Sequence, residues 1–133
     1  MRQLIQELYS LYPEIVPGTI EFENDGEPHL VKYSGKTKGT VAHTDNSEFK
    51  CITVNAMLSA QDEYTGGGTH ITNLDETIRL QQGEMLIHLG DLEHAGVEIR
   101  SGVRRIFIAF LACEWKDEAL NKPIIENARD YKG

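Results

Sequence analysis

Two histidines, one aspartate and one arginine have the types and the spacing of a metal site beside an anion site. His43 and Asp45 are separated by one residue, and Arg104 follows His94 by ten residues. Two imidazoles and one carboxylate form the ligand set of a non-haem Fe(II) site, which leaves coordination positions open. An arginine pairs bidentately with a carboxylate and stays charged at any working pH. A keto acid that chelates the metal and binds Arg104 through its far carboxylate would take two of the open positions and leave one for O2.

Each of these residues also has an ordinary structural interpretation. The H-x-D pattern alone is weak evidence, because Asp45-Asn46-Ser47 also reads as a turn. His94 alone could be a core or strand-edge histidine, and Arg104 beside Arg105 could be a solvated pair. The joint spacing of the four residues favours the metal site.

Three other histidines are expected to play no direct part as ligands. His70 and His88 have neither a carboxylate two residues away nor an arginine ten residues beyond. We therefore expect His88 to be a core residue or to support the ligands from behind, and His29 to lie at the surface.

The composition is that of one folded domain without an affinity for nucleic acids. The chain has 133 residues, 40% of them hydrophobic and 26% charged, which fits a single globular unit. Its formal net charge of -8 disfavours a nucleic-acid partner. The N-terminus shows neither a signal peptide nor a membrane span, so a cytoplasmic location is expected. Cys51 and Cys113 lack metal-site spacing and are expected to be buried thiols.

The periodicity predicts one helix followed by short strands. Apolar residues at helical spacing predict an amphipathic helix over residues 4–11, and a connector with one short strand at 19–22 follows it up to residue 28. A core over 29–113 then contains eight predicted strands, and a tail over 114–133 is helix-prone but interrupted by Pro123. The strands are expected at residues 29–33, 39–43, 49–58, 69–73, 77–80, 85–89, 95–99 and 104–113.

Eight short strands favour a mainly β jelly-roll, with two sheets facing each other across a pocket. In the last strand Ile106, Ile108 and Phe110 share one face, while residues 107, 109 and 111 share the other, so both faces are expected to be covered, one by the N-terminal helix. A turn at Ser101-Gly102 would bring Arg104 and His94 to the same end of the pocket.

The chain resembles the Fe(II)- and 2-oxoglutarate-dependent dioxygenases, specifically the prolyl and lysyl hydroxylase branch. The resemblance runs from about residue 30 to residue 110, and Glu63-Tyr64-Thr65-Gly66-Gly67-Gly68 is most similar to the collagen lysyl hydroxylases. The segments that carry it are, in chain order, Val31-Lys32-Tyr33, His43-Thr-Asp45, Phe49, Thr53-Val54-Asn55, Tyr64-Thr-Gly66-Gly67-Gly68, Gly83, His88, Gly90, His94-Ala-Gly96 and Gly102-Val-Arg104.

The resemblance implies a double-stranded β-helix, another name for this jelly-roll, and a role for seven residues. Iron would be bound by His43, Asp45 and His94, and Arg104 would bind the distal carboxylate of 2-oxoglutarate. Tyr33 would hydrogen-bond the same co-substrate, and Thr69 and Phe110 would line its pocket. The cofactors implied are Fe(II), 2-oxoglutarate and O2 as co-substrates, and ascorbate as a reductant.

Two departures from the family pattern bear on partner and substrate. About 28 residues precede the first core strand, fewer than in relatives, so a second subunit in a homodimer is an expected source of support. Thr40 stands where the prolyl branch often has a tyrosine, which weakens a close prolyl assignment.

The resemblance implies hydroxylation of an aliphatic C–H bond, with release of succinate and CO2. A peptidyl lysine or proline is the expected substrate. A free amino acid or another small molecule is the alternative within the enzyme class, because a short chain has few loops that could bind a polypeptide. A non-catalytic jelly-roll that binds a metal or ligand is the alternative from another class.

Overall fold

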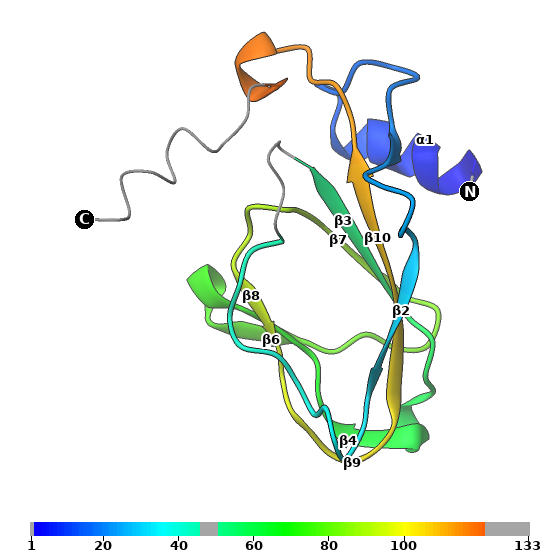
Figure 1. Cartoon of the computed structure of the whole chain (residues 1–133), viewed down its shortest axis with the longest axis vertical. Coiled ribbons are helices and arrows are strands. Elements are labelled where there is room, and N and C mark those ends of the chain that lie inside the picture. The colour runs from blue at the N-terminus through cyan, green and yellow to red at the C-terminus, as the bar shows by residue number, and fades with distance from the viewer. Residues whose placement is uncertain (1, 46–50, 122–133) are drawn as a thin grey trace.

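The longest strand, β10 (Arg104–Ala112), organises the main sheet. On one side it pairs with β3 (Ile52–Met57), which in turn pairs with β7 (Met85–Leu89). On its other side β10 pairs with β2 (His29–Tyr33) and, further along, with β1 (Glu21–Phe22). All of these pairings are antiparallel. Figure 1 shows the sheet in the computed structural model, which describes residues 2–45 and 51–121.

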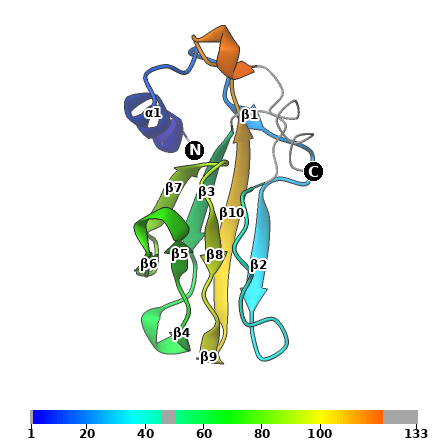
Figure 2. The same ribbon diagram turned by 90° about the vertical axis from the view of Figure 1, so that its left-hand side faces the viewer.

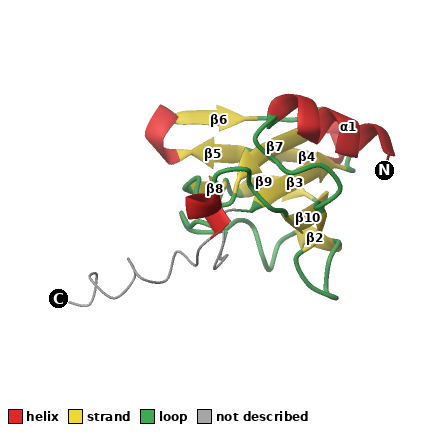
Figure 3. Cartoon of the chain, turned by 90° about the horizontal axis from the view of Figure 1, so that it is seen from above, coloured by secondary structure: helices red, strands yellow, loops and turns green. Residues whose placement is uncertain are grey.

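Two smaller sheets complete the β architecture. The first has the order β6 (Glu76–Ile78), β5 (Thr69–Ile71), β8 (His94–Gly96), and the second pairs β4 (Tyr64–Gly66) with β9 (Ile99–Gly102). In Figure 1, β6 and β8 lie across from β2, β3 and β10, and Figure 3 shows the same layers from above. The described residues also form three short 3₁₀ helices. They are η1 (Gln61–Glu63) before β4, η2 (Thr72–Leu74) between β5 and β6, and η3 (Glu118–Asn121) after β10.

Strand alternation gives the main sheet two buried faces. Along β10 the side chains of Ala109 and Leu111 pack with Leu8 of the helix α1 (Arg2–Leu11) in one hydrophobic cluster, while Ile106 belongs to a second cluster with Tyr33. Figure 2 shows α1 beside the upper end of the main sheet, and in Figure 1 it lies on the side of that sheet away from β6 and β8. The opposite face of the sheet is turned toward β5 and β8 and is therefore free to form a pocket between the sheets.

Most of the predicted elements are confirmed. The helix and the strand at 29–33 form as expected, and the helix also covers one face of the main sheet. The last strand is confirmed over Arg104–Ala112. The predicted strand at 49–58 is observed as β3, although residues 49 and 50 lie outside the described residues. Together these elements give a mainly β, jelly-roll-like arrangement with one N-terminal helix.

Three predictions of local structure are wrong. Residues 39–43 form an extended loop with one isolated bridge, not a strand, because the chain contacts β8 at only a few points. The predicted strand at 95–99 divides into β8 and β9, which belong to different sheets. Ser101 and Gly102 belong to β9 and pair with Thr65 and Tyr64 of β4, a strand that the turn-like glycine run concealed.

The sequence also leads to predictions for the C-terminal segment and the two cysteines. The predicted C-terminal helical tail is seen only as η3, since residues 122–133 lie outside the described residues. Cys51 is buried and Cys113 is half-buried, and the two form no disulfide. Within residues 2–45 and 51–121, no helix has the length and apolarity needed to cross a bilayer. The single domain, the homodimer and the cytoplasmic location stay predictions.

Candidate metal and co-substrate site

The backbone holds His43 beside His94. Residues 39–45 run along β8, where His43 and His94 form an isolated antiparallel bridge and each N–H donates to the other's carbonyl at 2.9 Å. The N–H of Asp45 donates to the carbonyl of Gly90 at 2.9 Å. Side chains two residues apart in an extended segment project to the same side, so His43 and Asp45 both face His94.

The Nε2 atoms of both histidines point at one carboxylate oxygen. His43 Nε2 lies 3.7 Å from Asp45 Oδ1, and His94 Nε2 lies 3.6 Å from it. Each Nδ1 lies 2.8 Å from the carbonyl oxygen two residues earlier in the chain, that of Val41 or Leu92. Because a carbonyl only accepts hydrogen bonds, each Nδ1 carries the proton and each Nε2 lone pair is left for a metal.

These three donor atoms fit a divalent metal ion. They all lie within 4.8 Å of one another. Neighbouring ligands of an octahedral ion with bonds of about 2.1 Å are roughly 3 Å apart, so a small inward movement of the rings would complete the site. The side chains of Asp45 and His94 are 8% and 12% exposed, whereas that of His43 is 41% exposed. Two imidazoles and a carboxylate suit Fe(II) and leave positions for other ligands.

Thr53 and His88 support Asp45 from behind. Thr53 Oγ1 donates to Asp45 Oδ2 at 2.6 Å, which leaves Oδ1 directed at the two imidazoles. His88 is 6% exposed, its Nε2 lies 3.8 Å from Asp45 Oδ2, and its ring centroid lies 4.7 Å from that of His94. Burial lowers the pKa of His88, and nearby His94 lowers it further, against the opposing effects of a backbone hydrogen bond to Leu89 and of Asp45. His88 is thus a neutral ring at pH 7 that packs behind the ligands, as expected.

Arg104 is a buried cation that lacks an anion. It is 2% exposed, it forms no ion pair with a carboxylate among the described residues, and its Nε has no hydrogen-bond partner there. Its guanidinium lies 5.2 Å from the centroid of the Tyr33 ring. Burial lowers the pKa of Arg104, and Tyr33 and Tyr64 oppose that shift. Because a buried charge without a counter-ion is costly, a carboxylate ligand would satisfy this side chain.

Gly67 leaves space for the side chain of Arg104. Gly67 has a φ of +72°, and a Cβ at this position would lie 3.3 Å from Arg104 Cδ. The glycine run after Tyr64 therefore both permits left-handed backbone and clears space beside the guanidinium.

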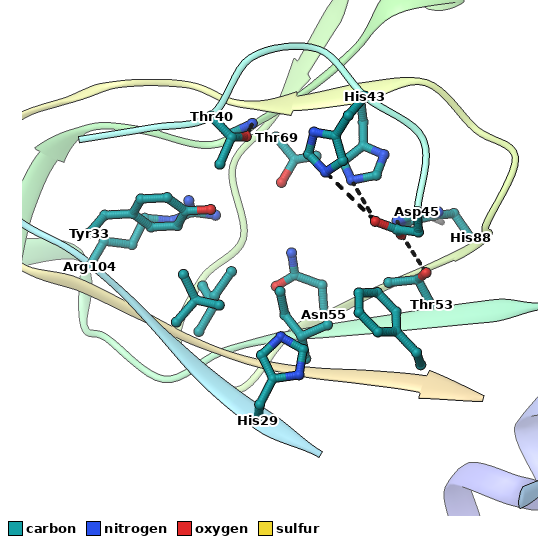
Figure 4. A pocket seen from close by; sticks show the side chains of 16 residues that line it. His29, Tyr33, Thr40, His43, Asp45, Thr53, Asn55, Thr69, His88 and Arg104 are labelled. Atoms are coloured by element: carbon teal, nitrogen blue, oxygen red, sulfur yellow. Dashed lines mark hydrogen bonds and ion pairs between the residues drawn. The ribbon is translucent and has the colours of Figure 1, made fainter. Parts of the chain in front are cut away.

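A single pocket of about 230 Å³ connects the metal site to Arg104. Figure 4 shows His43 and Asp45 at one side and Tyr33 with Arg104 at the other. The predicted placement of Arg104 and His94 at the same end is therefore wrong. The structure brings all seven predicted site residues to this pocket: Tyr33, His43, Asp45, Thr69, His94, Arg104 and Phe110.

Four polar residues line the same pocket without a predicted role there: His29, Thr40, Thr53 and Asn55. Thr53 and Asn55 were part of the resemblance but were given no role, and His29 was expected at the surface. His29 is partly exposed, as expected, but its side chain also faces the pocket, because it pairs with Ile108 of β10. Strand alternation could have found it, since His29 shares a face of β2 with Tyr33.

Comparison with solved structures identifies the fold. No protein-family model matches this sequence, and no curated protein matches it. Two structures of the viral collagen prolyl hydroxylase from Paramecium bursaria Chlorella virus-1, one in complex with 2-oxoglutarate and one a truncated form, superpose with TM-scores of 0.64 and 0.63. Both are 16% identical to this chain and match 83% of it, while the matches cover 69% and 65% of the viral chains. The chain therefore has the fold of that viral hydroxylase.

Proposed function

We propose that this protein is an Fe(II)- and 2-oxoglutarate-dependent dioxygenase that hydroxylates an aliphatic C–H bond. The observation that carries the proposal is the presence, in one pocket, of a His-Asp-His cluster and a buried arginine that has no carboxylate partner among the described residues. Bound iron, with O2 and 2-oxoglutarate, would supply the oxidising chemistry, with succinate and CO2 as the other products and ascorbate as a reductant. The fold shared with a hydroxylase solved with 2-oxoglutarate supports the same proposal.

The residues of this chain would bind and orient the reactants. His43, Asp45 and His94 would hold the metal through Nε2, Oδ1 and Nε2. Arg104 would bind the distal carboxylate of 2-oxoglutarate, with Tyr33 as a hydrogen-bond donor to the same group. The walls contributed by Ile106, Ile108 and Phe110 keep the space between the two ends apolar, which limits access of water to the reacting atoms.

The substrate that fits best is a side chain of a peptide, with lysine or proline as the proposed residue. A cavity of about 230 Å³ lies below the range of roughly 300–1,000 Å³ that is usual for ligand sites, so it has room for the co-substrate and little more. The rest of a peptide would lie outside the pocket. A free amino acid is the alternative, because it would bring a similarly small group to the metal.

The test is succinate release by the purified protein with Fe(II), 2-oxoglutarate, ascorbate and O2. A panel of lysyl peptides, prolyl peptides and free amino acids should include a substrate that stimulates release and gains the mass of one oxygen atom. The variant Asp45→Ala should release none. If metal and 2-oxoglutarate bind but no substrate yields succinate, the protein is a binding module.

A further inference from the structure

A rigid pair, Glu27 and His29, lies beside Phe110 at the side of the pocket remote from Arg104. His29 Nδ1 lies 2.9 Å from Glu27 Oε2, and the ring centroids of His29 and Phe110 are 5.5 Å apart. Glu27 Oε2 also accepts the N–H of Phe110 at 3.4 Å. The Glu27 side chain is 5% exposed and that of His29 is 36% exposed. Since a carboxylate only accepts, Nδ1 donates and the ring orientation is fixed.

Two carboxylates, those of Glu23 and Glu27, lie behind this side of the pocket and do not line it themselves. The N–H of Glu23 donates to the carbonyl of Phe110 at 2.9 Å, which places Glu23 on the same side. Burial raises the pKa of Glu23, and repulsion from Glu27 and then from Asp45 raises it further. Glu23 and Glu27 lie on the two sides of one residue, because the N–H of Glu23 donates to the Phe110 carbonyl and the Phe110 N–H donates to Glu27 Oε2. Arg104, at the far side, is the only lysine or arginine among the described residues that line the pocket (Figure 4).

A buried hydrogen-bond acceptor in the same pocket lacks a partner. Asn55 is 8% exposed, it lines the pocket, and its Oδ1 has no hydrogen-bond partner among the described residues. In Figure 4 its amide lies between His29 and the side chains around Asp45. The 2-oxoglutarate dianion has no N–H or O–H group, so it cannot donate to this oxygen. A second ligand with an N–H group can do so.

We propose that His29 and Asn55 in the pocket, with the carboxylates of Glu23 and Glu27 behind them, form a recognition site for a primary ammonium group of the substrate. The proposal rests on the proposed function for the identity of the second ligand. A cation beside these carboxylates would offset their mutual repulsion and donate to Asn55, whereas the neutral ring of a proline would do neither. The rings of His29 and Phe110 would contact the methylene chain of a lysine-type side chain. The pocket would thus place an anion at Arg104 and a cation at the opposite side.

The direct test is peptide binding without turnover. Two fluorescent peptides that differ only in lysine or Nε-acetyl-lysine at the central position are titrated under nitrogen with Fe(II) and 2-oxoglutarate present. The wild type should bind the lysine peptide about tenfold more tightly, the loss expected when a charge-assisted hydrogen bond becomes a neutral one. Glu27→Gln and Glu23→Gln should each remove most of this difference and leave the affinity for 2-oxoglutarate unchanged. Equal binding of the two peptides by the wild type would overturn the proposal.

Two controls separate recognition from folding. Glu21→Gln changes the same charge on the exposed strand β1, where Glu21 pairs with Ala112 and not with Phe110, and should keep the lysine preference. Glu27 is buried, so its variant is compared by thermal unfolding with Glu23→Gln, whose side chain is half-buried. A lysine preference that survives in both folded variants would contradict the assignment.

The outcome also distinguishes this site from the proposed function. Selective binding of the lysine peptide without succinate release would contradict the proposed function and support the ammonium site. Succinate release stimulated equally by the lysine and acetyl-lysine peptides would support the function and overturn the ammonium site.

Discussion

The backbones of His43 and His94 exchange two hydrogen bonds of 2.9 Å although the residues lie far apart in the sequence. One histidine comes from the loop that follows β2 and the other from β8, so the metal ligands meet only when the two sheets face each other. A metal that binds this arrangement binds the folded state and not the unfolded chain. Metal affinity and stability are therefore linked.

Removing one ligand should abolish that linkage. Added Fe(II), or Mn(II) as an air-stable probe, should raise the melting temperature of the wild type, with a stabilisation of about 2.7 kcal/mol at a hundredfold excess over Kd. Asp45→Ala and His94→Ala should lose this rise. The control is His70→Ala, a histidine that pairs with Asp75 and does not line the pocket. A metal-dependent rise that persists in Asp45→Ala would exclude Asp45 as a ligand.

Thr53 should act on the metal through Asp45. Its hydroxyl donates to Oδ2 at 2.6 Å, so Thr53→Val frees the carboxylate to rotate. Loss of such a supporting contact typically weakens metal binding about 10- to 100-fold. Titration calorimetry should show that loss, and Thr53→Ser should restore affinity because it keeps the hydroxyl. Thr65→Val removes a comparable bond to Ser101 at the surface and should have no effect.

The buried charge of Arg104 should lower the stability of the ligand-free protein, while it should contribute to binding of 2-oxoglutarate. Arg104 is 2% exposed and lacks a counter-ion among the described residues. Replacing buried charged groups by apolar ones of similar volume is often neutral or stabilising by about 1–4 kcal/mol, so Arg104→Met should melt at or above the temperature of the ligand-free wild type. The same variant should lose the stabilisation by 2-oxoglutarate seen in the wild type by scanning fluorimetry. Retained stabilisation by 2-oxoglutarate would place the carboxylate elsewhere.

His88 should make the fold sensitive to acid. Burial lowers the pKa of this group in the folded state, so below the ordinary value of about 6.5 the unfolded chain takes up a proton that the folded chain does not. The contribution to stability is complete above about pH 6.5 and is lost as the pH falls, by at most about 1.4 kcal/mol per pH unit. Urea unfolding in a chelator between pH 7.5 and 5 should show a shallower decline for His88→Gln. His70→Gln, which removes the imidazole of a His70–Asp75 pair outside the pocket, should show the same decline in stability as the wild type.

Strands whose side chains alternate between two faces can be predicted from the sequence. Strands that pair because glycines let two backbones come close together cannot. In β10 the alternation of Ile106 and Phe107 is visible in the sequence, and the strand forms as expected. In β4 and β9 the pairing depends on glycines, since a Cβ at Gly102 would lie 2.1 Å from the carbonyl oxygen of Glu63. Such close approach leaves no periodic signal, so Gly66-Gly67-Gly68 reads as a turn.

The residues of the candidate site also fall into a group that the sequence predicts and a group that it does not. The spacing of His43, Asp45 and Arg104 carries chemical information by itself, and the structure brings these side chains to one pocket. Alternation puts His29 on the face of β2 that carries Tyr33, but its alignment with Asn55 depends on cross-strand register, because both residues pair with Ile108. Register is set by the whole fold and cannot be read from one short segment.

Gly96 should control the position of the Tyr33 hydroxyl. A Cβ at Gly96 would lie 3.0 Å from Tyr33 Oη and 3.0 Å from Thr40 Oγ1, the group that accepts the Gly96 N–H at 2.7 Å. Gly96→Ala should therefore displace the tyrosine hydroxyl and weaken 2-oxoglutarate binding about three- to tenfold, the range expected for one lost neutral hydrogen bond. Metal affinity should stay unchanged, because the His94 ring is fixed by its own bond to Leu92.

Three comparisons decide whether Tyr33 transmits this effect. Tyr33→Phe should show a similar loss, and the double variant should lose little more than either single one, because both remove the same contact. Gly35→Ala is the matched control, since a Cβ there meets no atom within 4 Å. Equal weakening of metal and 2-oxoglutarate in Gly96→Ala would instead mean that the alanine disturbs the contact between β8 and the loop that carries His43.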